Sequence, residues 1–249
     1  MNSNLLEVIE LRKSFGALIA TDGVNFDVRA GETHAVIGPN GAGKTTLIKQ
    51  LSGELRPDMG QIRFAGEDIT GLAVQRCSRK GLARSFQITS IYRDFSALDN
   101  VALAVQAHAG HSFRFWRPAR EDNSLTRPAM QALEKVGLEK RSGTLAANLS
   151  HGEQRQLEIA MALATQPRML LLDEPVAGMG IDESQRMVEL LATLKGDKTI
   201  VLVEHDMDAV FTLADRISVL VYGRIVATGT PAEIRANPEV RAAYLGEDL

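Results

Sequence analysis

Residues Val36-Ile37-Gly38-Pro39-Asn40-Gly41-Ala42-Gly43-Lys44-Thr45-Thr46 decide the fold of this chain. They fit the phosphate-loop pattern of a glycine, four residues, a second glycine, a lysine and a threonine. Glycines allow left-handed backbone conformations, so successive backbone N–H groups can point at an anion. Lys44 can reach the β and γ oxygens of a nucleotide, and the Thr45 hydroxyl can ligate Mg²⁺. We therefore expect this stretch to hold nucleotide phosphates.

The segments on either side of the loop support this interpretation. Residues 34–37 form a short apolar run that predicts a buried strand, and residues 45–51 carry apolar side chains at helical spacing before Gly53 ends the pattern. The order of strand, loop and helix places the phosphates at the positive end of a helix. An ordinary glycine-rich turn is the alternative, but the motif rarely occurs by accident in this frame.

Bulk composition is that of an ordinary globular protein. The chain has 249 residues, 45% of them hydrophobic and 24% charged, which fits a single domain or a core with one inserted subdomain. A net charge of −3 gives no global reason to expect nucleic-acid binding, although it leaves a local basic patch open.

The cysteine content and the apolar segments predict where the protein acts. Cys77 is the only cysteine, which excludes an internal disulfide and a multi-cysteine zinc site and fits a reducing compartment. No segment approaches the roughly 20 apolar residues that cross a bilayer, and the N-terminus lacks a signal pattern. We expect a cytoplasmic protein whose membrane role, if any, comes through a partner.

The first third of the chain predicts β structure around the loop. Residues 4–13 and 24–28 indicate an antiparallel sheet, and Phe15 falls in the intervening turn, where it could stack on an adenine ring or close a small apolar cluster. Residues 61–64 and 82–86 predict further strands, the second ending at Gln87. This glutamine could reach Mg²⁺ or the attacking water, although an isolated glutamine is more often a surface residue.

The middle of the chain changes to helical periodicity. Residues 97–109, 125–136 and 152–164 predict an all-helical insertion in an α/β core. Between the first two of these helices, residues 111–118 interleave aromatic and basic side chains. This stretch is either a patch that faces nucleic acid or lipid or a loop that packs on the neighbouring helices, and we favour the loop.

The last helix of the insertion begins with Leu149-Ser-His-Gly-Glu-Gln-Arg-Gln156. Ser150 and Glu153 stand at the spacing of a capping box. Small Gly152 and the Ser150 hydroxyl at a helix N-terminus also form an anion site. Both interpretations can hold at once.

Two later apolar strands end in groups suited to catalysis. Residues 169–173 end in Asp173 and Glu174, which point to opposite sides, so we expect Asp173 to support Mg²⁺ and Glu174 to polarise a water for attack on the γ-phosphate. Residues 199–203 are followed by Glu204-His205-Asp206, and we expect His205 to contact the γ-phosphate. A hairpin over 216–228 and two short helices close the chain.

Taken together, these motifs resemble the ATP-binding subunit of an ABC transporter over essentially the whole chain. The matching elements are Walker A (38–45), the Q-loop (Gln87), the signature (149–153), Walker B (170–173), the catalytic carboxylate (Glu174), the switch histidine (His205) and the aromatic that stacks on adenine (Phe15). The resemblance implies ATP and Mg²⁺ as ligands, with Thr45, Gln87 and Asp173 on the metal. It also implies a dimer in which Ser150, Gly152 and Glu153 cap the ATP held by the other subunit.

The same resemblance sets the expected domain organisation. We expect an α/β fold with a P-loop NTPase (RecA-like) core and an N-terminal antiparallel β subdomain over residues 1–87 and 165–228. An inserted α-helical subdomain would occupy 88–164 and carry the signature, and a helical tail would occupy 229–249.

Two departures from the family pattern stand out. The signature commonly reads Leu-Ser-Gly-Gly-Gln, whereas His151 and Glu153 replace its third and fifth residues here. The serine and second glycine that meet phosphate are kept, so the resemblance still implies ATP binding. The D-loop usually carries an acidic residue where this chain has Gly180, which bears on communication between the two sites.

Within the family, residues 113–117, 203–210 and 237–246 look like those of importers for branched-chain amino acids and related solutes. This likeness implies two membrane permeases, a second ATP-binding subunit that is identical or related, and, indirectly, a periplasmic solute-binding protein. It places the chain on the cytoplasmic face of the inner membrane and implies no nucleic-acid partner. An ATPase of lipopolysaccharide export, whose tail is similar, ranks second; a soluble ABC-type ATPase and a non-hydrolytic regulator rank lower.

Overall fold

The computed structural model describes residues 4–84, 91–109 and 122–240. Three expectations lie outside these ranges: the Q-loop glutamine at position 87, the aromatic and basic stretch at 111–118, and the end of the tail from 241 onwards.

Within the described residues, the larger of two sheets has six strands in the order β10-β9-β3-β8-β7-β6. In chain order they are β3 (Thr33–Ile37), β6 (Leu82–Arg84), β7 (Met169–Asp173), β8 (Thr199–Val203), β9 (Arg216–Val221) and β10 (Arg224–Gly229). Neighbouring strands from β9 to β6 run parallel, and β10 adds an antiparallel edge. Every residue of β3, β7 and β8 is buried, as expected for parallel strands covered on both faces.

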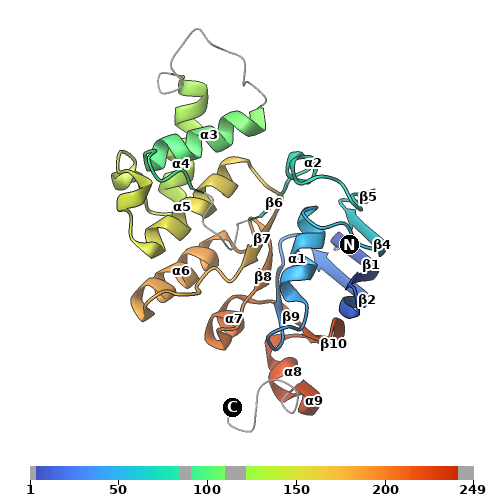
Figure 1. The fold of residues 1–249 in the computed structure, drawn as a ribbon. Helices are drawn as coiled ribbons and strands as arrows, with labels where there is room; N and C mark the ends of the chain where they lie inside the picture. Colours follow the sequence, from blue (N-terminus) through green and yellow to red (C-terminus); the bar gives the residue numbers. More distant parts are fainter. Residues whose placement is uncertain (1–3, 85–90, 110–121, 241–249) are drawn as a thin grey trace.

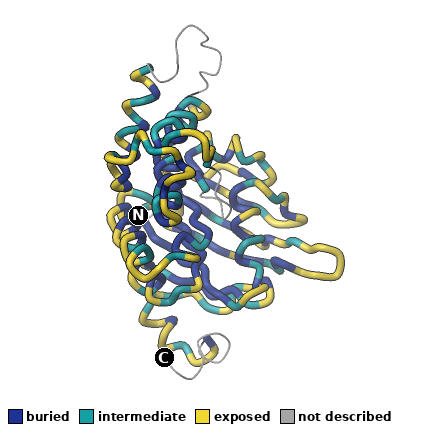
Figure 2. The backbone as a smooth tube through the Cα atoms, turned by 60° about the vertical axis from the view of Figure 1, so that its left-hand side comes forward, coloured by how far each residue is buried: buried dark blue, intermediate teal, exposed yellow. Residues whose placement is uncertain are grey.

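Alternation along these strands divides the interior into two apolar clusters. Met169 and Leu171 of β7 contribute to one cluster, and Leu170 and Leu172 contribute to the other. Figure 2 shows the buried residues concentrated along the central strands, with exposed residues on the surrounding loops and helices. The fully apolar strands therefore form the middle layer of the protein.

The first cluster is closed by α1 (Lys44–Ser52) and by the second sheet, whose order is β2-β1-β4-β5. Its strands are β1 (Asn4–Phe15), β2 (Leu18–Arg29), β4 (Met59–Phe64) and β5 (Glu67–Asp68). Helix α2 (Val74–Arg79) follows them in the chain. The antiparallel pairing of β1 with β2 confirms the expected hairpin-like start of the chain.

The second cluster is covered by helices. They are α3 (Ala97–Ala109), α4 (Asn123–Lys135), α5 (His151–Ala164), α6 (Ile181–Leu194), α7 (Met207–Leu213), α8 (Pro231–Ala236) and α9 (Pro238–Val240), with short 3-10 turns at Glu139–Arg141 and Ala146–Asn148. Figure 1 shows α3, α4 and α5 gathered beyond the β6 edge of the large sheet, on the side away from β1 and β2. The α/β core, the antiparallel sheet and the group of helices confirm the predicted fold class.

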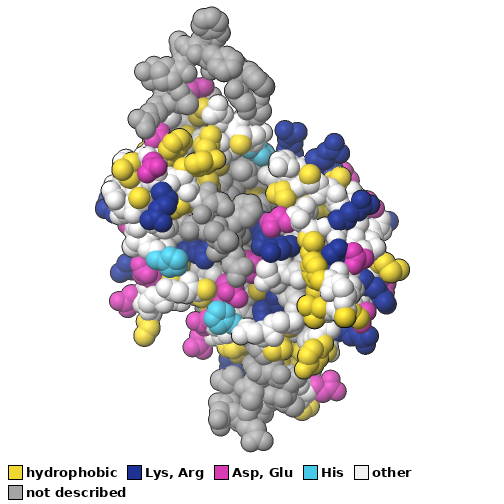
Figure 3. Space-filling model, viewed as in Figure 1, with side chains coloured by type: hydrophobic (Ala, Val, Ile, Leu, Met, Phe, Trp, Pro, Cys, Tyr) yellow, Lys and Arg dark blue, Asp and Glu magenta, His cyan; other side chains and the backbone are white. Residues whose placement is uncertain are grey.

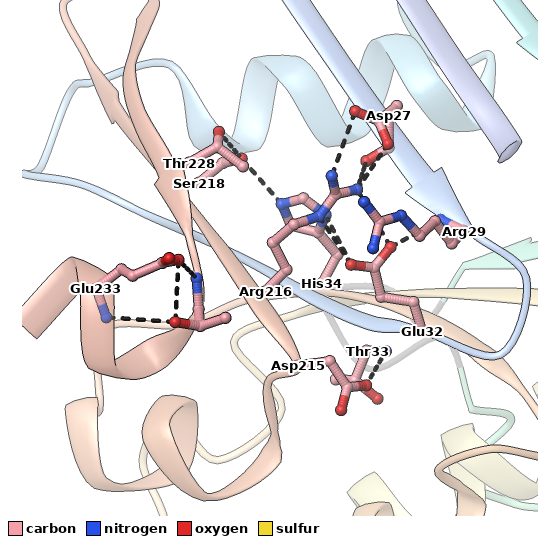
Figure 4. Close-up of polar contacts among 11 residues, drawn as sticks. Asp27, Arg29, Glu32, Thr33, His34, Asp215, Arg216, Ser218, Thr228 and Glu233 are labelled. Carbon is pink, nitrogen blue, oxygen red and sulfur yellow. Dashed lines mark hydrogen bonds and ion pairs between the residues drawn. The ribbon is translucent and has the colours of Figure 1, made fainter. Parts of the chain in front are cut away.

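A partly buried polar cluster joins β2, β3 and β9 (Figure 4). Arg216 donates to Asp27 at 2.7 Å and to Glu32 at 2.8 Å. His34 lies beside them, and its Nε2 is 2.9 Å from the Ser218 hydroxyl. Burial, helped by the Arg216 cation and opposed by Asp27, lowers the pKa of His34 to about 3. The cluster therefore holds a neutral histidine next to an ion pair.

The depressed pKa of His34 predicts acid sensitivity. Protonation favours the unfolded chain, where the histidine pKa is about 6.5. The contribution of neutral His34 to the free energy of unfolding is complete above pH 6.5. It falls, by up to about 1.4 kcal/mol per pH unit, as the pH drops towards 3. Urea unfolding between pH 7.5 and 5 is expected to show a shallower pH dependence for His34→Gln than for the wild type. His108→Gln, at an exposed position on α3, should keep the wild-type slope, and equal slopes in all three proteins would contradict the account.

Candidate functional site

Three parallel strands end side by side at one edge of the large sheet. Val203 of β8 pairs in register with Val36 of β3 on one side and with Asp173 of β7 on the other. The phosphate loop follows β3, Glu174 directly follows β7, and His205 is the second residue after β8. The carboxyl ends of the strands therefore bring the three predicted groups to one edge, as is usual for ligand sites in parallel sheets.

The Lys44 side chain is hydrogen-bonded to the backbone of its own phosphate loop. Lys44 donates from Nζ to the Gly38 carbonyl at 2.6 Å and to the Pro39 carbonyl at 3.1 Å. Burial lowers the pKa of the Lys44 ammonium, whereas the nearby Glu174 and Asp173 carboxylates oppose that shift. This electrostatic coupling links the loop to the end of β7. Asn40 and Gly41 are exposed, while Thr45 and Thr46 at the start of α1 are half-buried.

Gly43 has a conformation and surroundings that exclude a side chain. Its φ is +105°, and an added Cβ would lie 2.1 Å from the Ala20 carbonyl oxygen of β2. Gly41 has φ +80°, but no atom of the described part of the chain lies within 4 Å of an added Cβ. Comparing substitutions at the two glycines therefore separates the effect of close packing from the effect of the left-handed backbone.

Alanine substitutions should reveal this difference. Gly43→Ala is expected to lower the free energy of unfolding by at least about 3 kcal/mol, because the backbone of β2 must move. Gly41→Ala should cost only about 1 to 2 kcal/mol for the left-handed backbone. Denaturant unfolding of both variants measures the difference, and equal losses would show that contact with Ala20 does not constrain the loop.

Asp173 is buried and has one oxygen available for a cation. Its Oδ2 accepts from Arg84 at 3.1 Å, while its Oδ1 has no hydrogen-bond partner among the residues that the structure describes. Burial raises the pKa of this carboxyl, and Arg84 opposes the shift. A buried carboxylate oxygen without a donor is suited to Mg²⁺, as is a threonine hydroxyl such as that of Thr45. The residues present therefore fit the metal predicted from sequence.

The role of Arg84 could not be predicted from the sequence, because its ion-pair partners lie on other elements of the fold. Arg84 lies at the end of β6, is almost fully buried, and also pairs with Glu54 after α1 at 2.5 Å. It therefore ties Asp173 of β7 to the chain beyond α1. An arginine inside the predicted strand 82–86, three residues before Gln87, was the available signal.

Glu174 and His205 face each other at the edge of the site. Glu174 has φ +52°, an unusual value for a side chain with a Cβ, and its backbone N–H donates to the Val203 carbonyl at 2.8 Å. Such strained residues often occur at functional sites. One Glu174 oxygen is 3.8 Å from His205 Nδ1, and the exposed fractions of the two side chains are 27% and 58%. Both side chains are thus partly accessible to solvent.

Glu204 is a second residue whose role the sequence did not reveal. Its side chain is completely buried, and it accepts from the backbone N–H of Val176 at 3.0 Å and of His205 at 2.9 Å. Burial raises the pKa of this carboxyl, and these backbone donors oppose the shift. Glu204 therefore joins the loop after Glu174 to the loop that carries His205. A carboxylate directly after an apolar strand was the signal for this arrangement.

The residues from Ser150 to Glu153 lie elsewhere. The predicted capping box is present, and Glu153 also pairs with Arg141 at 3.2 Å. His151 lies 3.4 Å from the Ala177 carbonyl, which connects this helix start to the loop after β7. Among the described residues, no hydrogen bond or ion pair joins Ser150, Gly152 or Glu153 to the phosphate loop. The structure thus contains two separate groups of predicted nucleotide contacts.

Phe15 is the exposed last residue of β1, paired with Leu18, so the prediction that it lies in the turn after the first strand is wrong. Its side chain belongs to neither apolar cluster, and the Lys13 ammonium lies 5.6 Å from its ring centroid. β2 leads from the adjacent turn to Ala20, which contacts Gly43. The aromatic ring therefore stands on the strand pair that borders the phosphate loop.

Two protein-family models match this sequence. Residues 21–177 match the family described as ABC transporter. Residues 224–249 match the family described as branched-chain amino acid ATP-binding cassette transporter.

Individual relatives match over the full length. The chain is 40% identical to the high-affinity branched-chain amino acid transport ATP-binding protein BraF of Pseudomonas aeruginosa, over 99% of this chain and 100% of BraF. A solved ATP-binding cassette of an ABC transporter in an ADP conformation superposes with a TM-score of 0.86 at 29% identity, covering 98% of this chain and all of the other. A dimeric bacterial cassette has the same fold, with a TM-score of 0.78 at 23% identity over 91% of this chain and 98% of its own.

Proposed function

The chain belongs to the ABC transporter family, and from this we infer that it is the ATP-binding and ATP-hydrolysing subunit of an importer for branched-chain amino acids. The convergence of Lys44, Asp173, Glu174 and His205 at one sheet edge carries the ATPase assignment. Full-length similarity to BraF and the family match over 224–249 support the amino acid specificity of the transporter.

We propose that the phosphate loop holds ATP through its backbone N–H groups and Lys44. In the structure, Lys44 donates to two carbonyls of its own loop. On nucleotide binding, phosphate oxygens would replace these carbonyls as acceptors, and the positive end of α1 would favour their charge. Phe15 would stack on the adenine ring from the border of the loop.

Mg²⁺ would be held by Thr45 and Asp173, and by Gln87 outside the described residues. When bound, Mg²⁺ would neutralise the negative charge of the phosphates. The part of Arg84 is to keep Asp173 oriented with its Oδ1 available. The buried position of Asp173 favours binding of a cation because an unpaired buried carboxylate is otherwise costly.

For hydrolysis, Glu174 would polarise the attacking water, and His205 would contact the γ-phosphate. The fixed backbone of Glu174 and the hydrogen bonds of Glu204 keep the two loops together without nucleotide. A second ATP-binding subunit would supply the signature residues Ser150, Gly152 and Glu153 to this nucleotide. The separation of the two groups of contacts within one chain supports such an arrangement.

The partners in the membrane would be two permeases. No helix in the described ranges has the length and apolarity needed to span a bilayer. Tyr92, Phe95 and Leu145 have exposed fractions of 55%, 44% and 45%, and the backbone beside Leu145 is hydrogen-bonded to Phe95. Figure 3 shows hydrophobic side chains on the surface of the helical part at the upper left. We propose the surface around Tyr92, Phe95 and Leu145 as the permease contact, on the cytoplasmic face of the inner membrane, with a periplasmic binding protein delivering the solute.

Phosphate release and affinity purification together test this function. The purified chain is expected to release phosphate from ATP when Mg²⁺ is present. Tagged chain retained on a resin with ATP and Mg²⁺ should recover two multi-spanning proteins from solubilised native membranes. Recovery of ribosomal or DNA-repair proteins without a permease would be consistent with the ATPase assignment but would overturn the transport role.

A further inference from the structure

A carboxylate from α6 lies directly on the signature residues. Glu183, in the first turn of α6, accepts a hydrogen bond from the Ser150 hydroxyl at 3.0 Å. A Cβ added to Gly152 would lie 3.1 Å from both the carboxyl carbon and an oxygen of Glu183. The glycine at this position therefore lets an anionic side chain approach the backbone at the start of α5.

The Ser150 hydroxyl has no second hydrogen to donate to another anion. A serine hydroxyl has one hydrogen, and an ionised carboxylate can only accept. The Ser150 hydroxyl therefore donates to Glu183, and its oxygen also accepts from the Glu153 backbone N–H at 3.2 Å. Phosphate oxygens also act as acceptors here. A phosphate can receive the Ser150 hydrogen only after Glu183 releases it.

We propose that Glu183 occupies, in the single subunit, the position that the γ-phosphate of the second subunit's ATP takes in the dimer. This inference rests on the proposed function, because it assigns Ser150 and Gly152 to the partner's nucleotide. Glu183 then sets how tightly the signature binds phosphate: its carboxylate competes for one hydrogen and repels the incoming charge. It is a residue that determines affinity at this site.

The surroundings of Glu183 provide a place for the displaced carboxylate. A cavity of about 240 Å³ is lined by Ser150, Gly152, Glu153, Glu183 and Arg186, among other residues. Arg186 is exposed and lies three residues after Glu183 on the same helix, a spacing at which opposite charges can pair. Glu153 already pairs with Arg141, so Glu183 is the carboxylate in this cavity that is available to move to Arg186.

Phosphate titration followed by site-resolved NMR tests the proposal without requiring a dimer. Inorganic phosphate would be added to the full chain, and the backbone amides of Gly152 and Glu153 would be followed. Glu183→Gln removes the charge, and Glu183→Ala also removes the acceptor. Both are expected to bind phosphate at the signature with a dissociation constant at least fivefold lower than that of the wild type.

The matched control is Asp182→Asn, the neighbouring exposed acid on the same helix, which makes no hydrogen bond or ion pair among the described residues. It carries the same change in charge and should stay within twofold of the wild type. If Glu183 only stabilises the fold, its variants will lower the unfolding midpoint without tightening phosphate binding, and the proposal is wrong. Equal binding by the Glu183 and Asp182 variants, or no saturable shift in any protein, overturns it too.

ATP titration of the same samples separates this proposal from the proposed function. Amides of the phosphate loop, such as that of Gly43, should shift with ATP equally in all four proteins. If ATP shifts no amide of the phosphate loop, the ATPase assignment is contradicted, whether or not phosphate binds at Gly152.

Discussion

Replacing Glu174 by glutamine is expected to slow ATP hydrolysis by about 100- to 10,000-fold, which is the typical contribution of a general base. The amide keeps the size of the side chain but cannot accept a proton from water. Its backbone should stay in place, because the Glu174 N–H donates to the Val203 carbonyl independently of the side chain. ATP affinity should therefore remain within about twofold of the wild type.

The same variant is expected to accumulate as an ATP-bound dimer, since the step that reopens it is blocked. Phosphate release and sedimentation with ATP and Mg²⁺ measure the two effects. Glu189→Gln, an exposed acid on α6 with the same change in charge, should match the wild type in both. If Glu174→Gln hydrolyses ATP at the wild-type rate, Glu174 has no part in the chemistry. If the variant stays monomeric at every ATP concentration, the expectation of a trapped dimer is wrong.

Replacing Lys44 by alanine is expected to weaken ATP binding by about 100-fold or more, in line with the loss of a buried hydrogen-bonded charge. Lys44 is the basic residue directly at the loop, and burial has already removed much of its hydration. The phosphates therefore gain a strong partner at little further desolvation cost. Calorimetric titration with ATP measures the loss.

The control for this variant is Lys49→Ala, an exposed lysine in the last turn of the same helix. It should bind ATP within about twofold of the wild type. Circular dichroism should show that the Lys44 variant remains folded although two loop carbonyls lose their donor. A Lys44→Ala protein that binds ATP within threefold of the wild type would show that the loop does not hold the phosphates as proposed.

The local parts of the fold could be predicted from sequence. The strand, loop and helix from Thr33 to Ser52 are encoded by neighbouring residues, and the helices near 97–109 and 152–164 show clear periodicity. α6 was not predicted, although Met187, Leu190, Leu191 and Leu194 follow helical spacing. The buried strands β3, β7 and β8 follow from their apolar runs, but the pairing of β3 with β8 and β9 does not follow from local pattern.

The long-range contacts in the candidate site could not be predicted. Arg84 meets Asp173 across 89 positions, Val176 meets Glu204 across 28, and Ser150 meets Glu183 across 33. Each pair joins elements whose relative placement depends on packing of the whole sheet and its helices. The sequence identified residues with suitable chemistry but not the side chains that orient or compete with them.

ATP-driven solute uptake tests the central claim most directly. The complex purified on the tagged wild-type chain would be placed in proteoliposomes with ATP inside and the source organism's solute-binding protein outside. Radiolabelled leucine, isoleucine or valine is expected to accumulate, and a complex carrying Glu174→Gln should accumulate none. If the wild-type complex hydrolyses ATP yet accumulates none of these amino acids, the chain does not power a branched-chain amino acid importer.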